Sequence, residues 1–261
     1  MSGRLPDMPL HTPVNLQDWQ DTTFLHWDYP PDLVQRLLPP GLRVQQWGGV
    51  TWIGVIPFRM ANVRGPGMPV VPGWKAFAEL NVRAYVTAPD GSEGIWFLGM
   101  LVARSSFALA LRTIGLPYWV SNSEVRTAWP RIDYRFGAPG LLGPRVKDWF
   151  TATVEVGAPL TEKERTPLVD TLTGRFTAFH RRGIMWQTPV EHQPWPLHRA
   201  TVDGELTAPL RWVGLPEPDS APMIQSSPGV NVKLASLRPA PMLRLPHAPP
   251  GRAYAPSAAR Q

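Results

Sequence analysis

The 261-residue sequence contains no cysteine, which excludes disulfide bonds, thiol nucleophiles and cysteine-ligated metal sites together. Long apolar runs are also absent: GIWFLGMLVA, at residues 94–103, is among the longest and falls far short of the ~20 residues that span a bilayer. The N-terminal segment MSGRLPDMPLHTPVN is polar and interrupted by prolines, so it has no apolar core of a signal peptide. These absences predict a soluble, cytoplasmic protein that does not bind membranes.

Lysine is scarce, and the net charge of +6 comes from arginines scattered along the chain. The longest basic cluster is only HRR, at residues 180–182. The sequence has no nucleic-acid-binding signature, no phosphate-binding P-loop, no dinucleotide fingerprint and no Gly-x-Ser-x-Gly nucleophile motif. We therefore predict no nucleic-acid partner and no cofactor. A homo-oligomer is compatible with the sequence.

Proline (32 residues) and glycine (22 residues) are abundant and separate short runs rich in β-branched and aromatic residues. This pattern predicts a mainly β protein with a few short helices. The helices are expected in PPDLVQRLLPPG (30–41), in RSSFALALRTI (104–114), and after Thr166 as the N-cap. We predict one domain over residues 15–238, between a loosely ordered segment at 1–14 and a Pro/Ala-rich tail at 239–261.

The segment AELNVRAYV, at residues 78–86, has the two-residue alternation of a strand. One face has Leu80, Val82, Ala84 and Val86, and the other has Glu79, Asn81, Arg83 and Tyr85. In one interpretation the polar face is in water, as in many antiparallel sheets. In the other it lines an enclosed cavity, and the two interpretations differ in the burial of Glu79 and Arg83.

A cavity lined by this face would suit a small organic acid or carbonyl compound. Arg83 has a planar guanidinium that matches a carboxylate, so it is the predicted anchor for an anion. Glu79, if removed from water, is raised toward neutrality and is the candidate acid or base. Asn81 and Tyr85 are predicted to orient the ligand.

Five segments occur in the order seen in a known family: FLHWDYPPDLVQRLLPPGL, GVTWIGVIPFRM, FAELNVRAYV, GLPYW and HQPWPLHRATV. Over about residues 15–236 the chain resembles the uncharacterised YqjF-like bacterial proteins of the acetoacetate decarboxylase-like superfamily. The resemblance implies a conical, double-layered antiparallel β-barrel with a central cavity. It also implies that Glu79 matches an active-site glutamate of the decarboxylases.

The same resemblance argues against decarboxylase activity. In the decarboxylases a Gly-x-Pro turn is followed by two lysines, one of which forms an imine with the substrate. Here the turn at residues 115–117 is followed by Tyr118 and Trp119, which cannot form an imine. Tyr118 is instead a candidate hydrogen-bond donor to the ligand, with packing of the turn as the alternative. Lys75 and Lys233 are expected to face solvent, although a position inside the cavity is left open.

The histidines do not form a metal-binding pattern. His180, His192 and His198 are separated by 12 and then 6 residues, which matches no common zinc motif. These residues and His26 are interpreted as structural, and no metal is predicted.

The sequence thus predicts a cavity that binds a small organic acid or carbonyl compound, with turnover left open. Glu79 and Tyr118 are the catalytic candidates, and Arg83, Asn81 and Tyr85 the binding candidates. Two alternatives use the same fold differently. One is a non-catalytic ligand carrier or sensor, and the other is an interaction scaffold whose interior is filled by side chains.

Overall fold

The computed structural model describes residues 5–6, 9–140, 143–144 and 146–241. Its strands form one sheet, and the mainly β prediction is confirmed. The strands are β1 (Asn15–Tyr29), β2 (Arg43–Val44), β3 (Thr51–Arg64), β4 (Ala76–Thr87), β5 (Glu93–Val102), β6 (Tyr118–Val120), β7 (Ser123–Ala128), β8 (Arg131–Phe136), β9 (Phe150–Pro159), β10 (Thr177–Arg182), β11 (Ile184–His192), β12 (His198–Asp203), β13 (Met223–Leu234) and β14 (Arg238–Pro239). The helices are α1 (Pro31–Gln35), α2 (Ser105–Arg112), α3 (Pro167–Thr173) and α4 (Ala208–Trp212).

Part of the sheet closes on itself. The strand order β11-β10-β5-β4-β3-β1-β13 returns to its start, because β11 also pairs with β13. Most neighbours in this ring are antiparallel, whereas β5 is parallel to β10 and to β6. The long hairpin of β4 and β5 turns at residues 88–92, where Gly91 has a φ of 89°. The ring encloses a space that the inward-facing side chains line.

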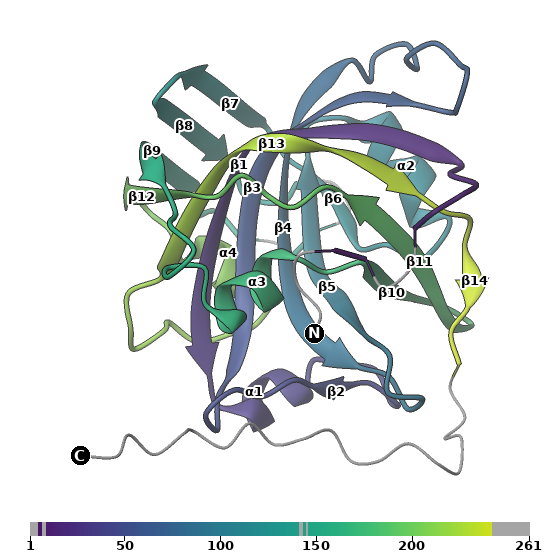
Figure 1. Ribbon diagram of the computed structural model, residues 1–261, viewed down its shortest axis with the longest axis horizontal. Coiled ribbons are helices and arrows are strands. Elements are labelled where there is room, and N and C mark those ends of the chain that lie inside the picture. Colours follow the sequence, from purple (N-terminus) through teal and green to yellow (C-terminus); the bar gives the residue numbers. More distant parts are fainter. Residues whose placement is uncertain (1–4, 7–8, 141–142, 145, 242–261) are drawn as a thin grey trace.

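Strands β12, β9, β8 and β7 continue from β13 and lie outside the ring (Figure 1). Their apolar side chains pack against the outer face of β3 and β4, so Leu80 and Val82 of β4 join one core with Ile132 and Val154. Both faces of β4 are therefore buried. This second layer removes the solvent-exposed sheet face that a simple alternating strand would have.

A backbone irregularity in β1 changes which of its side chains face inward. Asp21 has a φ of 47°, and the pairing of β1 with β3 shifts between Gln20 and Leu25. Gln17 and Trp19 line the interior before this point, and Thr22 lines it afterwards. The inward-facing residues thus change from odd to even numbers, because a β-bulge inserts one extra residue into the strand.

The predicted helices are present with different lengths. The α2 helix lies within its expected range, and the hydroxyl of Thr166 accepts a hydrogen bond from the Val169 amide at the start of α3. The α1 helix is only five residues long, but Leu37 and Leu38, which follow it, still pack against the outer core.

The expected domain limits stay predictions. At the N-terminal limit, the Val14 amide donates a hydrogen bond to the carbonyl of Leu234, 2.8 Å away. At the C-terminal limit, β14 pairs with β11, and residues 242–261 of the predicted tail lie outside the described residues.

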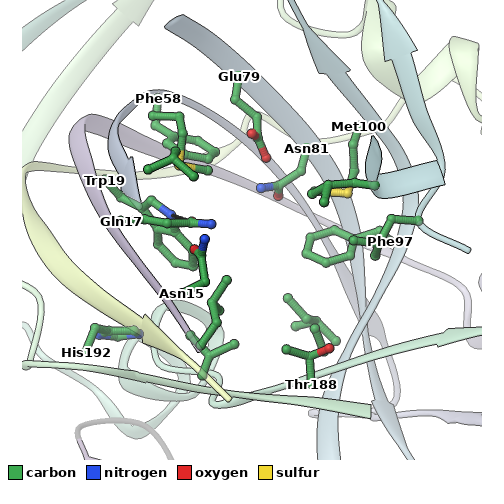
Figure 2. A pocket seen from close by; sticks show the side chains of 18 of the residues that line it. Asn15, Gln17, Trp19, Phe58, Glu79, Asn81, Phe97, Met100, Thr188 and His192 are labelled. Carbon is green, nitrogen blue, oxygen red and sulfur yellow. Dashed lines mark hydrogen bonds between the residues drawn. The ribbon is translucent and has the colours of Figure 1, made fainter. Parts of the chain in front are cut away.

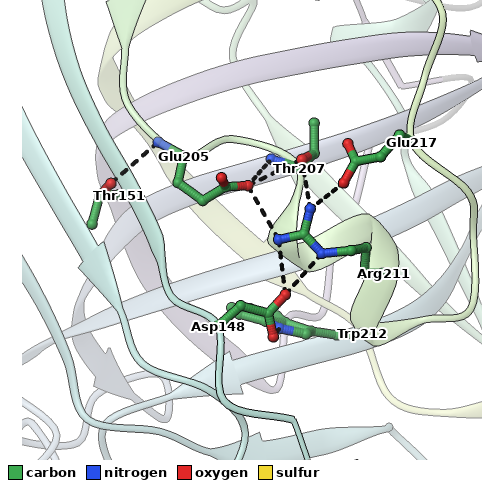
Figure 3. A network of polar contacts seen from close by, with 7 residues as sticks. All are labelled: Asp148, Thr151, Glu205, Thr207, Arg211, Trp212 and Glu217. Atoms are coloured by element: carbon green, nitrogen blue, oxygen red, sulfur yellow. Dashed lines mark hydrogen bonds and ion pairs between the residues drawn. The ribbon is translucent and has the colours of Figure 1, made fainter.

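Helix α4 is attached to the start of β9 by a polar network around Arg211 (Figure 3). The guanidinium contacts carboxylates from three segments, those of Asp148 at 2.8 Å, Glu205 at 3.3 Å and Glu217. The indole of Trp212 donates to Asp148 at 3.2 Å. All three carboxylates pair with the same arginine, so this cluster is structural in character.

Candidate functional site

The ring of strands surrounds a cavity of about 430 Å³. Its wall combines inward-facing side chains of the ring with residues of α2 and β6. The most exposed lining residues, Val14, Ser236 and Leu237, mark its rim. Figure 2 shows side chains from several strands pointing into one space, among them Glu79 and Asn81. A cavity of this size falls within the range of small-molecule sites and is inconsistent with a filled interior.

The polar row of β4 faces this cavity. Glu79, Asn81 and Arg83 all line it, and their exposed fractions are 2%, 7% and 6%. The interpretation in which this face is in water is therefore wrong, and the predicted enclosure is confirmed. The physical reason is the second layer, which covers the apolar side of β4 while the ring closes over its polar side.

Among the described residues, the carboxyl group of Glu79 has one hydrogen-bond partner. The Tyr118 hydroxyl donates to its Oε1, 3.0 Å away. The other oxygen, Oε2, is buried without a partner among the described residues. Burial raises the pKa of Glu79 to about 8, against the smaller lowering effect of the Tyr118 hydrogen bond. At neutral pH this carboxyl is mostly protonated and has a proton to donate.

Tyr118 and Trp119 face opposite sides of the sheet after the Gly-x-Pro turn. Tyr118 points into the cavity, whereas Trp119 packs against the outer core. The turn needs glycine, because Gly115 has a φ of 91° and a Cβ there would lie 2.4 Å from the carbonyl oxygen of Arg181. The turn therefore closes the fold and also presents the phenol to Glu79.

Arg83 is a buried cation that has no acidic partner in the described part of the chain. Its Nε donates to the Tyr85 hydroxyl at 3.0 Å, and its Nη2 donates to the Leu172 carbonyl at 2.7 Å. No carboxylate among the described residues forms an ion pair with it. The guanidinium also lies 5.7 Å from the ring centre of Phe24. A charge removed from water in this way usually has a counter-ion, so the arrangement favours an anionic ligand.

Tyr85 lies behind Arg83 and does not line the cavity. Its hydroxyl donates to the Leu172 carbonyl at 2.7 Å and is 2.6 Å from Nε2 of His26. With the phenol proton directed at Leu172, His26 is the donor to Tyr85. The predicted role of Tyr85 in contacting the ligand is thus replaced by one in positioning Arg83.

Substitution of Tyr85 by phenylalanine tests this network. The change removes the acceptor of two buried donors, those of Arg83 and His26, so we expect the free energy of unfolding to fall by about 1–3 kcal/mol. Urea denaturation measures the free energy of unfolding. Tyr29→Phe is the control, because the Tyr29 hydroxyl only donates to the Pro216 carbonyl. A loss no larger than in this control would contradict the network.

The lysines lie apart from the cavity. All four lysines are exposed, and Lys233 pairs with Glu191 at 2.8 Å, so neither Lys75 nor Lys233 reaches the interior. No group of three histidine, aspartate or glutamate side chains in the described part of the chain could bind a metal.

None of the described helices has the length and apolar character needed to cross a membrane.

Several lining residues were not singled out from the sequence. Asn15 and Gln17 come from β1, whose bulge hides the alternation, and Arg175 follows α3. His192, interpreted as a structural residue, lines the cavity, where burial and the charge of Arg83 lower its pKa to about 4. Arg175 lies 5.7 Å from the ring of Tyr85 and pairs with Glu93. At neutral pH the cavity wall therefore has a positive character.

Comparisons with known proteins agree with this architecture. The model of the DUF2071 family, described as an uncharacterized conserved protein (COG2071), matches residues 16–231. The uncharacterized protein YqjF of Bacillus subtilis (strain 168) is 29% identical over 228 residues, which cover 85% of this chain and 90% of that protein. The resemblance inferred from the five sequence motifs is confirmed.

Two solved structures share the fold with a TM-score of 0.61. One is an acetoacetate decarboxylase-like enzyme from Sphingomonas wittichii RW1, 12% identical, with coverage of 92% of this chain and 98% of that one. The other is the enduracididine biosynthesis enzyme MppR complexed with the condensation product of pyruvate and imidazole 4-carboxaldehyde, 14% identical, with coverage of 88% and 90%. At these identities the likeness establishes an acetoacetate decarboxylase-like fold.

Proposed function

The chain belongs to the DUF2071 family, and on that premise we propose that its cavity binds an organic acid with a carbonyl group and exchanges a proton with it. The observation that carries the proposal is the buried Arg83 guanidinium, which faces the cavity without an acidic partner among the described residues. Its remaining hydrogen-bonding capacity matches the two oxygens of a carboxylate.

Glu79 is the proton carrier in this proposal. Because its pKa is about 8, both its acid and its carboxylate are populated near neutral pH, as general acid–base catalysis requires. The carboxylate takes a proton from the carbon next to the ligand carbonyl and leaves an enolate. The resulting acid then returns a proton to that carbon. The amide of Asn81, which lines the cavity beside Glu79, is placed to donate to the enolate oxygen.

The structural neighbours support a carbonyl acid as the ligand class, since the name of one refers to acetoacetate and the other is complexed with a pyruvate-derived product. An imine intermediate is not part of the proposal. Tyr118 and Trp119 stand in place of the lysine pair, and the four lysines are exposed.

A panel of carboxylic acids with and without a carbonyl group tests the binding step. We expect at least one acid to raise the melting temperature, and at a hundred times its Kd to add about 2.7 kcal/mol to the free energy of unfolding. The neutral amide of the same compound is the matched control and should have a much weaker effect. If no acid in the panel exceeds its amide, the cavity does not recognise carboxylates.

Exchange of the ligand's hydrogens with D2O distinguishes an enzyme from a carrier. NMR of the best acid in D2O should reveal loss of the proton signal next to the carbonyl in the presence of the protein, and not with Glu79→Gln. A ligand that saturates the protein without any exchange would favour the non-catalytic carrier or sensor.

A further inference from the structure

The cavity is larger than a three- or four-carbon keto acid requires. Its volume of about 430 Å³ equals that of roughly fourteen molecules of liquid water. Binding sites usually bury most of the surface of their ligand, so a compact keto acid would leave much of this wall uncovered. The size of the space points to a longer ligand.

The two polar ends of the cavity are far apart. Glu79 and Arg83 are four residues apart on β4, which corresponds to about 13 Å between their Cα atoms. Arg83 is directed away from Glu79, because its hydrogen bonds go to Tyr85 and to the end of α3 at Leu172. Glu79 is held at the other end by Tyr118. A single small keto acid cannot contact both groups.

The wall between and around these ends is mainly apolar. It includes Trp19, Phe58, Phe97, Met100, Phe107 and Leu111. The last two belong to α2, which packs beside β6 near Tyr118 (Figure 1); the rings of Phe107 and Tyr118 are 5.4 Å apart. The α2 helix therefore covers the Glu79 end of the cavity, whereas α3 covers the Arg83 end.

Resting on the proposed function, we propose that the ligand is an elongated carboxylic acid with an apolar body. Its carboxylate binds Arg83, and its chain passes Asn81 along the aromatic wall. Its second polar group, a carbonyl or hydroxyl remote from the carboxylate, lies between Asn81 and the Glu79–Tyr118 pair. Small polar keto acids are then poor ligands of this cavity.

A series of straight-chain acids from acetate to decanoate tests the inference by calorimetry at neutral pH. We expect affinity to rise about three- to fourfold per methylene. The rise should stop at roughly eight to ten carbons, when the chain spans the distance from Arg83 to Glu79. Pyruvate and acetoacetate should bind more weakly than octanoate, and Arg83→Met should remove the binding of octanoate.

Leu111→Ala and Leu109→Ala form a matched pair on α2. Leu111 lines the cavity, whereas Leu109 is 63% exposed and does not. Leu111→Ala should weaken decanoate about fivefold and leave butyrate unchanged, and Leu109→Ala should change neither.

The outcomes separate the two proposals. If pyruvate or acetoacetate binds as tightly as octanoate in an Arg83-dependent manner, the elongated ligand is wrong, and the carboxylate-binding step of the proposed function stands. If octanoate binds equally well to Arg83→Met, Arg83 is not the anchor, and both the orientation proposed for the chain and the carboxylate site of the proposed function are wrong. If no acid of any length binds, the proposed function itself fails.

Discussion

Replacing Arg83 with methionine is expected to weaken the binding of the best carboxylic acid by about a hundredfold or more. The loss follows because the bound carboxylate would remain buried without the counter-charge of Arg83, which typically costs 2–5 kcal/mol. Methionine keeps much of the side-chain volume beside Phe24, so the shape of the wall should change little. Isothermal titration with wild-type protein and variant measures the difference.

The stability expected for Arg83→Met differs from the stability expected if Arg83 only supported the fold. Removing a buried charge without an acidic partner relieves a desolvation cost of several kcal/mol, which offsets the lost hydrogen bonds to Tyr85 and Leu172. Without ligand, Arg83→Met should therefore be no less stable than the wild type.

Arg175→Met is the comparison for Arg83→Met. Arg175 is also buried but pairs with Glu93, so its loss should destabilise the fold and affect acid binding less. An Arg83→Met protein that unfolds readily yet still binds the acid would assign Arg83 a structural role.

Glu79→Gln is expected to be clearly more stable than the wild type at alkaline pH. Glu79 has a pKa of about 8 in the folded protein and the usual value of 4.5 when unfolded. Below pH 4.5 the group is protonated in both states and contributes no pH dependence. Between pH 4.5 and 8 the unfolded chain releases a proton that the folded chain retains, so the free energy of unfolding falls as pH rises. Over this pH range the free energy of unfolding falls by a total on the order of 5 kcal/mol.

The amide of Glu79→Gln cannot ionise, so the variant should lack this slope and match the wild type near pH 5. Urea denaturation between pH 5 and 9 measures both curves. Glu164→Gln is the control, because hydrogen bonds from Thr161 lower the pKa of Glu164 to about 2. The stability that Glu164 contributes changes only as pH falls from 4.5 toward 2, so between pH 5 and 9 the Glu164→Gln curve should run parallel to that of the wild type. Parallel curves for wild type and Glu79→Gln would mean that Glu79 is not shielded from water.

Much of the fold could be predicted because its signals are local. Alternation over residues 78–86 identified β4, and Thr166 as the N-cap identified the start of α3. The change of inward side at Asp21 breaks the alternation of β1, so the sequence pattern does not reveal which of its side chains face inward. A bulge of this kind depends on pairing with β3, which is distant in the sequence.

The candidate site could be predicted in part for the same reason. Glu79, Asn81 and Arg83 share one strand, so their common face follows from a two-residue period. The contact between Tyr118 and Glu79 crosses 39 residues, and that between Arg83 and Leu172 crosses 89. No local pattern contains such contacts. The hydrogen bonds of the Tyr85 hydroxyl with Arg83 and Leu172 could therefore not be predicted.

By itself, the sequence determined the mainly β class, the absence of cysteine, the Tyr118–Trp119 pair after the Gly-x-Pro turn, and the row of polar groups on β4. Only the tertiary structure decided that this row faces an enclosed cavity, that Arg83 lies there without an acidic partner among the described residues, and that Tyr118 meets Glu79. The reason is that side-chain periodicity depends on neighbouring residues of one strand. Burial and charge pairing depend instead on ring closure and on the second layer, which bring distant segments together.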